Sequence, residues 1–328
     1  MRNSRENDSV SRPSNDTLDL RPRTDFDGPE LSFELAGLEI GCAEYDEGPT
    51  GCTVFHFPDG ASLQTDVRGG SPGTFGVGYE WVTAICLAGG SLYGLEAVSG
   101  VAAELLARRD YRTGWLDIPI VAGAIIFDYG PRDNGVYPDK ELGRAALRAA
   151  RPGVFPLGAR GAGRSATVGK TFSLEELEPA GQGAAVRQLG DARVAVFTVV
   201  NSVGAVIDRK GNVVRGHLDA ATGTRRALVP GVEERLASGL PVHPTPGNTT
   251  LTVVVTNQKL DPRLLRTLGR QVHASMARAI QPFHTLVDGD VLYAVSTNEV
   301  DDPAVDSIGL GVVASELAWD AVLAAVSD

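Results

Sequence analysis

Short apolar runs alternate along this chain with segments whose apolar residues recur at helical spacing, and this alternation limits the fold more than any other feature. Helix-start signals support two of the helical segments, with Pro138 in one and the pair Asp261-Pro262 in the other. Alternating strands and helices predict an α/β or layered α+β class in a single domain. Strands are expected over residues 53–57, 62–67, 120–127, 192–200, 205–208, 251–256 and 291–296, and helices over 94–109, 138–150, 261–280 and 308–325.

The composition indicates which partners and which cellular compartment to expect. A formal net charge of −11 over 328 residues argues against nucleic acid and anionic membranes as partners, because both require a basic face. The sequence contains no uncharged apolar run of membrane-spanning length. The three cysteines, Cys42, Cys52 and Cys86, form no Cys-x-x-Cys pair, which fits free thiols better than a disulfide framework. We therefore expect a cytoplasmic protein.

The first 30 residues differ in composition from the rest. They are rich in Arg, Asp, Asn, Ser and Pro and contain no apolar core of the signal-peptide type. Such a composition favours a disordered polar tail. The folded domain is expected to begin near Leu31 and to cover residues 31–328.

The segment Pro246-Gly247-Asn248-Thr249-Thr250 directly precedes the apolar run over residues 251–255. Pro-Gly-Asn is turn chemistry, and the threonines after it are typical of the first residues of a strand. An N-terminal nucleophile enzyme needs such a hydroxyl: the threonine attacks the preceding carbonyl, the chain breaks, and the freed amine becomes the base. The same residues also fit an ordinary turn.

Three further positions each fit two hypotheses. Asp288-Gly289-Asp290 is a turn signal before an expected strand, but its two carboxylates could also hold an ammonium group. Asn201 either caps the turn that follows its strand or donates to an oxyanion. Lys170, in a glycine-rich segment, is either a solvated loop lysine or a functional group.

Two other kinds of site are not expected. The segment over residues 163–171 resembles a P-loop, but Arg164 occupies a position where the phosphate-binding motif requires glycine. The five histidines show no spacing typical of metal ligands, so we expect no metal site. A Ser-His-Asp triad stays open, although nothing in the sequence selects one.

Taken together, several ordered stretches resemble the nylon-oligomer hydrolases. These are endo-type 6-aminohexanoate-oligomer hydrolases, within the wider group of self-cleaving L-aminopeptidase D-amidase/esterases. The likeness runs from about residue 31 to the end of the chain. It is carried by Glu47-Gly48-Pro49-Thr50-Gly51, Ile85-Cys86-Leu87-Ala88-Gly89-Gly90, Tyr93-Gly94-Leu95-Glu96-Ala97, Val136-Tyr137-Pro138-Asp139-Lys140, Gly181-Gln182-Gly183-Ala184-Ala185, Gly247-Asn248-Thr249-Thr250, Ile280-Gln281-Pro282-Phe283-His284-Thr285, Asp288-Gly289-Asp290 and Ala318-Trp319-Asp320-Ala321-Val322-Leu323.

The resemblance implies an N-terminal-nucleophile-like α-β-β-α sandwich. A single domain would consist of two chains, residues 31–248 and 249–328, after self-cleavage between Asn248 and Thr249. Family members assemble into ring-like tetramers of cleaved pairs, so a homotetramer is expected. The resemblance implies no cofactor.

The resemblance also assigns the site residues. Thr249 matches the nucleophile, Lys170 a lysine that contacts its hydroxyl, and Asn201 an asparagine lining the same site. Asp288 and Asp290 match the acidic pair around the new N-terminus. We expect a charged Lys170 and Asn201 to stabilise negative charge, and the aspartates to orient the amine and to raise the pKa of Lys170.

A linear oligomer of 6-aminohexanoate is the expected substrate, and its methylenes call for a partly apolar groove, for which Tyr137 and Phe283 are candidates. Three alternatives stay open. The same machinery could serve an aminopeptidase or amidase acting on short peptides. A Thr nucleophile also occurs in self-cleaving ornithine acetyltransferases, which transfer acyl groups. The third alternative is a shell protein that never cleaves.

Overall fold

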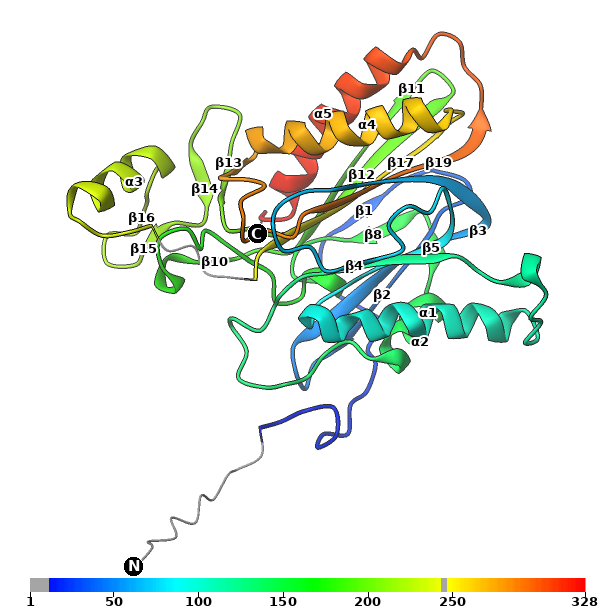
Figure 1. Ribbon diagram of the computed structural model, residues 1–328, viewed down its shortest axis with the longest axis horizontal. Helices are drawn as coiled ribbons and strands as arrows, with labels where there is room; N and C mark the ends of the chain where they lie inside the picture. Colours follow the sequence, from blue (N-terminus) through cyan, green and yellow to red (C-terminus); the bar gives the residue numbers. More distant parts are fainter. Residues whose placement is uncertain (1–11, 243–246, 328) are drawn as a thin grey trace, which may run out of the picture.

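The computed structural model describes residues 12–242 and 247–327 (Figure 1). One ten-stranded mixed sheet forms the centre of the molecule, and its pairs β17–β19 and β5–β6 are parallel. The strand order is β11 (Gln182–Leu189), β12 (Ala192–Asn201), β17 (Thr249–Gln258), β19 (Val291–Val300), β3 (Thr50–Val67), β5 (Trp81–Ala88), β6 (Val121–Ile125) and β4 (Thr74–Phe75), while β2 (Glu39–Tyr45) pairs with β3 and with β7 (Arg151–Pro152).

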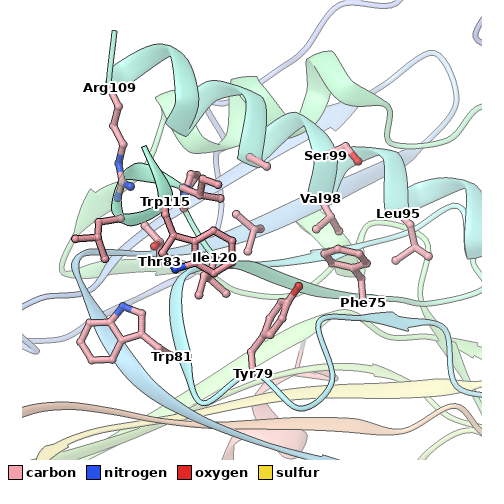
Figure 2. Close-up of a pocket in the computed structure, with 15 residues that line it drawn as sticks. Phe75, Tyr79, Trp81, Thr83, Leu95, Val98, Ser99, Arg109, Trp115 and Ile120 are labelled. Carbon is pink, nitrogen blue, oxygen red and sulfur yellow. The ribbon is translucent and has the colours of Figure 1, made fainter. Parts of the chain in front are cut away.

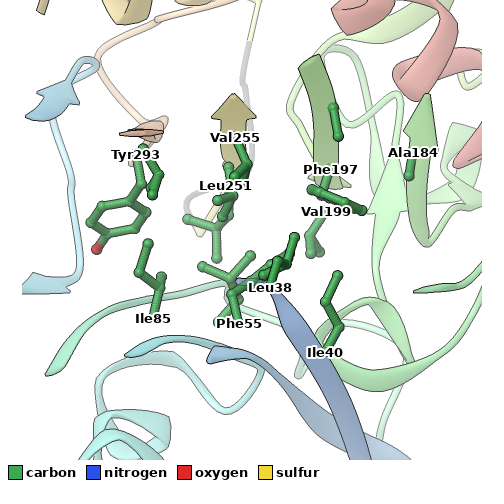
Figure 3. Packing of buried hydrophobic residues seen from close by; sticks show 14 of the residues in the cluster. Leu38, Ile40, Phe55, Ile85, Ala184, Phe197, Val199, Leu251, Val255 and Tyr293 are labelled. Carbon is green, nitrogen blue, oxygen red and sulfur yellow. The ribbon is translucent and has the colours of Figure 1, made fainter. Parts of the chain in front are cut away.

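Strand β3 turns this one sheet into two layers. Its first half pairs with β2 and β5, its second half pairs with β19, and the register with β5 shifts between His56 and Ala61. The two strands expected over residues 53–57 and 62–67 are therefore one continuous strand. The main core lies between the layers, where Phe55 and Ile85 face Phe197, Leu251 and Tyr293 (Figure 3).

Helices cover both outer faces of the sheet. Helices α4 (Pro262–Ser275) and α5 (Ser307–Ala324) lie over β11, β12, β17 and β19, and α1 (Leu95–Arg108) and α2 (Lys140–Arg148) lie over the other layer (Figure 1). Strand β12 shows why both faces must be covered: Ala195, Phe197 and Val199 point into the main core, whereas the intervening valines point toward the helices. The layers thus follow the order α-β-β-α, as predicted.

Aspartates cap the two helices for which the sequence offered start signals. Asp261 accepts a hydrogen bond from the Leu264 N–H and precedes Pro262, as predicted for α4. In α2 the cap is Asp139, which accepts from the Leu142 N–H, so Pro138 lies before the helix rather than in its first turn. Helix α4 ends at Ser275, earlier than the expected residue 280, because the 3-10 turn η5 (Met276–Arg278) follows it.

Several elements were not predicted from the sequence, above all the strands β2, β5 and β11 of the main sheet. A smaller excursion between β12 and β17 carries α3 (Leu228–Ala237) and lies at the left of Figure 1. The remaining short strands are β1 (Glu30–Ser32), β8 (Val154–Pro156), β9 (Thr167–Val168), β10 (Glu178–Pro179), β13 (Ala205–Ile207), β14 (Val213–Arg215), β15 (Leu218–Asp219), β16 (Thr224–Arg225) and β18 (Ile280–Gln281).

The prediction of a disordered tail over residues 1–30 is wrong for residues 12–30, and residues 1–11 lie outside the described part. Asn15 exchanges hydrogen bonds with the backbone of Tyr137 and donates to Asp139. Arg23 pairs with Glu44 through both backbone and side chain. Polar composition suggested disorder, but these side chains bond to the domain instead of to water.

Helix α5 is, within residues 12–242 and 247–327, the one helix long and apolar enough to cross a membrane by length and composition. Glu316 and Asp320 interrupt its apolar sequence and pair with Arg209. Its inner face packs on β11 and β12 as part of the core under α4 and α5.

Candidate functional site

Thr249 begins β17 at the end of the sheet where β12 finishes, and it is paired with Asn201 across the two strands. Only 3% of Thr249 is exposed. Its Oγ1 donates to the Asn248 carbonyl oxygen at 2.6 Å, and the Gly289 N–H donates to the same oxygen at 2.8 Å. The peptide bond preceding Thr249 is therefore held between a hydroxyl and a backbone donor. Pro246, part of the motif, lies outside the described residues.

Gly289 is required by this close packing. A Cβ at this position would lie 2.4 Å from the Ser71 carbonyl oxygen and 2.9 Å from the Thr249 Oγ1. Any larger residue would push the backbone donor away from the Asn248 carbonyl. The Asp-Gly-Asp segment thus provides this close approach as well as a turn.

Asn201 connects the site to three other segments through its buried side chain. Its Oδ1 accepts from the Thr167 N–H at 3.0 Å and from the Lys170 Nζ at 3.1 Å. Its Nδ2 donates to the carbonyl oxygens of Phe127 at 3.0 Å and Gly247 at 3.4 Å. Asn201 thereby links Lys170 to the segment that precedes Thr249.

Lys170 follows β9 and is buried, with 4% of its surface exposed. Its Nζ donates to the Asn201 side chain and, at 3.2 Å, to the Asn201 backbone carbonyl, whereas the resemblance implied a contact with the Thr249 hydroxyl. Burial lowers the pKa of Lys170 to about 7, although Asp288 favours the charged form. Asp288 thus acts on the pKa of Lys170 in the expected direction, but desolvation outweighs its attraction and the net shift is downward.

The two aspartates hold backbone groups at the entrance of the strands. Asp288 accepts from the N–H and the hydroxyl of Thr285, at 2.8 and 2.6 Å. Asp290 accepts from the Thr250 N–H at 2.7 Å and thereby fixes the residue after Thr249. Burial, and then the charge of Asp290, raise the pKa of Asp288. Asp290 therefore orders the start of β17, and Asp288 orders the turn that precedes β19.

The structure brings Thr249, Lys170, Asn201, Asp288 and Asp290 together, whereas the contacts of Tyr137 are with other residues. The Tyr137 ring packs on Tyr93, with ring centroids 5.8 Å apart, and its Cβ lies against Gly90. The link to the site is indirect: Asp128 binds the Gly90 N–H, and the neighbouring Phe127 carbonyl binds Asn201.

A large apolar pocket of about 830 Å³ lies between α1 and the β4–β5 region (Figure 2). Phe75, Tyr79, Trp81, Val98 and Ile120 are among the residues that line it. It occupies the starts of the parallel strands β5 and β6, whereas the chain leaving the other end of β6 reaches Asn201 through Phe127. Tyr137 and Phe283, the candidates for an apolar groove, do not line this pocket.

One side chain at the site was missed in the sequence. His284 lies in the turn before β19, and its Nδ1 is 2.8 Å from the Asp290 Oδ2. Its partner is six residues away in the chain, a spacing that matches no motif. No group of three His, Cys, Asp or Glu residues suited to a metal ion occurs among the described residues.

Comparisons with known proteins agree with this architecture. The profile of peptidase family S58 matches residues 33–328. A 6-aminohexanoate-oligomer endohydrolase of Agromyces sp. is 49% identical over 95% of this chain and 90% of its own length. The solved structure of a Burkholderia sp. β-aminopeptidase aligns with a TM-score of 0.62 at 16% identity, over 91% of this chain and 88% of that one. The L-aminopeptidase D-Ala-esterase/amidase of Ochrobactrum anthropi, a variant of the Ntn hydrolase fold, aligns with a TM-score of 0.63 at 14% identity, over 92% and 88%. The N-terminal-nucleophile-like fold is thereby confirmed.

Proposed function

Because the chain belongs to peptidase family S58, whose members hydrolyse amide bonds, we propose that it is a self-processing hydrolase that cleaves linear 6-aminohexanoate oligomers with Thr249 as the nucleophile. The observation that carries the proposal is the Thr249 hydroxyl, 2.6 Å from the Asn248 carbonyl oxygen at a buried strand entrance. The substrate rests on the relative that is 49% identical over nearly the whole chain.

Self-cleavage would begin with attack of the Thr249 Oγ1 on the Asn248 carbonyl carbon. The Gly289 N–H, already 2.8 Å from the carbonyl oxygen, would stabilise the negative charge that develops there. The C–N bond then breaks, the Thr249 nitrogen takes up a proton, and an ester joins the two pieces. Water hydrolyses the ester, leaving a carboxylate on Asn248 and a free amine on Thr249.

Lys170 is the candidate base for this first step, since the α-amine of Thr249 is still part of a peptide bond. Its pKa of about 7 gives a substantial neutral fraction near neutral pH. The rate of self-cleavage is expected to rise with pH through about 7 and then to level off.

In the cleaved enzyme, the Thr249 amine would take over as base, and its ordinary pKa of about 7.7–8 suits that role. Asn201 would gain a second function. One of its donors binds the Gly247 carbonyl, which lies on the segment that cleavage disconnects from Thr249. Departure of that segment would free the donor for the oxyanion of the substrate. Attack on the substrate amide forms an acyl-ester and releases an amine, and water then regenerates Thr249.

Intact mass and denaturing electrophoresis of the purified protein test the proposal first. Two pieces, the smaller one beginning at Thr249, are expected from the native chain, and one uncut chain of 34.4 kDa from Thr249→Ala. Thr249→Ala should also lose hydrolysis of 6-aminohexanoate oligomers. Oligomers with a blocked amino end separate the two modes of cleavage, because only an endo-acting enzyme cuts them. Retained amide hydrolysis by Thr249→Ala would contradict the assignment.

A further inference from the structure

Asp290 divides its two oxygens between the nucleophile strand and a histidine. It is fully buried; its Oδ1 accepts from the Thr250 N–H at 2.7 Å, and its Oδ2 lies 2.8 Å from the His284 Nδ1. The ring nitrogen is a donor suited to this carboxylate oxygen, which is an acceptor. The position of the residue after Thr249 therefore depends on a carboxylate that His284 holds from the other side.

The His284 ring is fixed by a second histidine. His273 meets it edge to face, with ring centroids 4.5 Å apart, and its own Nδ1 lies 2.9 Å from the Asp66 Oδ2. The Phe283 ring packs on the His284 ring, with ring centroids 3.9 Å apart. Burial lowers the pKa of His273 to about 4, so this ring is neutral at pH 7 and adds no positive charge beside His284.

Each ring is held through one nitrogen. Within residues 12–242 and 247–327, the buried Nε2 atoms of His284 and His273 have no hydrogen-bond partner. His284 also has a left-handed backbone, with φ of 60°, which is uncommon for a residue other than glycine. A residue kept in this conformation with an unsatisfied buried nitrogen costs stability, so its single bond to Asp290 calls for an explanation.

We propose that His284 is a positioning residue of the Thr249 site, which fixes Asp290 and through it the backbone of Thr249 and Thr250. The inference rests on the proposed function and adds a residue to it. His284 contacts neither the Thr249 hydroxyl nor the Asn248 carbonyl. Its effect is on where the nucleophile and its amine stand, both before and after self-cleavage.

The experiment compares variants of His284 with and without a side-chain hydrogen-bond donor to Asp290. His284→Gly removes the side chain and tolerates the left-handed backbone. His284→Asn also tolerates it and places an amide N–H where Nδ1 was. We expect His284→Gly to slow self-cleavage and to lower kcat on 6-aminohexanoate oligomers by about tenfold or more, with KM within about twofold, because misplacement of a nucleophile affects the chemical step. His284→Asn should recover most of the loss.

His56 provides the matched control, because its Nδ1 pairs with Glu39 at 2.9 Å in a strand away from the site. His56→Ala should change the melting temperature without changing kcat. If the His284→Gly protein is not folded by circular dichroism, His284→Ala, which also lacks a side-chain donor, takes its place. Wild-type kcat in the donor-free variant, or equal losses in it and His284→Asn, would overturn the inference. A native chain that neither cuts itself nor hydrolyses oligomers would instead overturn the proposed function.

Discussion

Lys170 is a buried lysine in a site that contains two carboxylates. Burial opposes its charge and Asp288 favours it, and the balance between these two effects can be measured. Its pKa falls from 10.5 to about 7 in the folded protein. Between these values the unfolded chain binds one more proton than the folded one, so the free energy of unfolding rises with pH across this window. Below about pH 7 both states are protonated, and the full cost of burying the charge is present.

Replacing Lys170 with methionine should therefore stabilise the fold most at low pH. In a Thr249→Ala background, which keeps every sample uncut, we expect Lys170→Met to raise the free energy of unfolding by about 1–4 kcal/mol at pH 6. The gain should shrink as the pH approaches 10, where wild-type Lys170 is neutral in the fold. Urea unfolding at both pH values measures it. A gain of equal size at both pH values would show that the cost of burying Lys170 does not come from its charge.

At the scale of the element, Asp261 allows a clean test of helix α4. Its Oδ1 accepts from the Leu264 N–H at 2.8 Å and so satisfies one of the free donors of the first turn. Asp261→Ala is expected to cost about 1 kcal/mol of stability, and Asp261→Asn much less. The melting temperature measures both, and kcat should stay unchanged because Asp261 lies at the start of α4, about three turns before His273, whose ring contacts His284. Loss of activity without loss of stability would mean that the first turn of α4 also shapes the site.

The same elements show what the sequence can and cannot predict. Asp261-Pro262 and the threonines before residue 251 are local signals, so α4 and β17 were predicted close to their observed positions. Strand β5 was missed because both of its faces are buried, which removes the alternation that marks a strand. Lys170, Asn201 and Thr249 were assigned through the resemblance, since the pairing of β12 with β17 brings Asn201 to Thr249 and only hydrogen bonds to Asn201 bring Lys170 there. His284 was missed because its contact with Asp290 depends on the conformation of the turn between them, and residue types do not reveal that geometry.

For the whole molecule, the proposed cut divides the chain but not the fold. The smaller piece, 80 residues from Thr249, would contain β17, α4, β19 and α5. In the sheet, β17 pairs with β12, and β19 pairs with β3, so this piece is held on both sides by the larger one. The proposed cleavage at Asn248 would break one peptide bond at the entrance of β17 and would leave these ladders in place.

The two pieces should consequently behave as one protein. The core between the layers joins Leu251, Val253 and Tyr293 of the smaller piece to Phe55 and Phe197 of the larger one, so neither can bury its apolar surface alone. After complete self-cleavage, we expect both pieces to elute together in native size-exclusion chromatography and to separate only in denaturant. Urea should unfold them in a single transition that fluorescence and circular dichroism report at the same midpoint. Release of the smaller piece without denaturant would mean that β17 and β19 do not stay in the sheet, and the site at their entrance would then be lost on cleavage rather than completed by it.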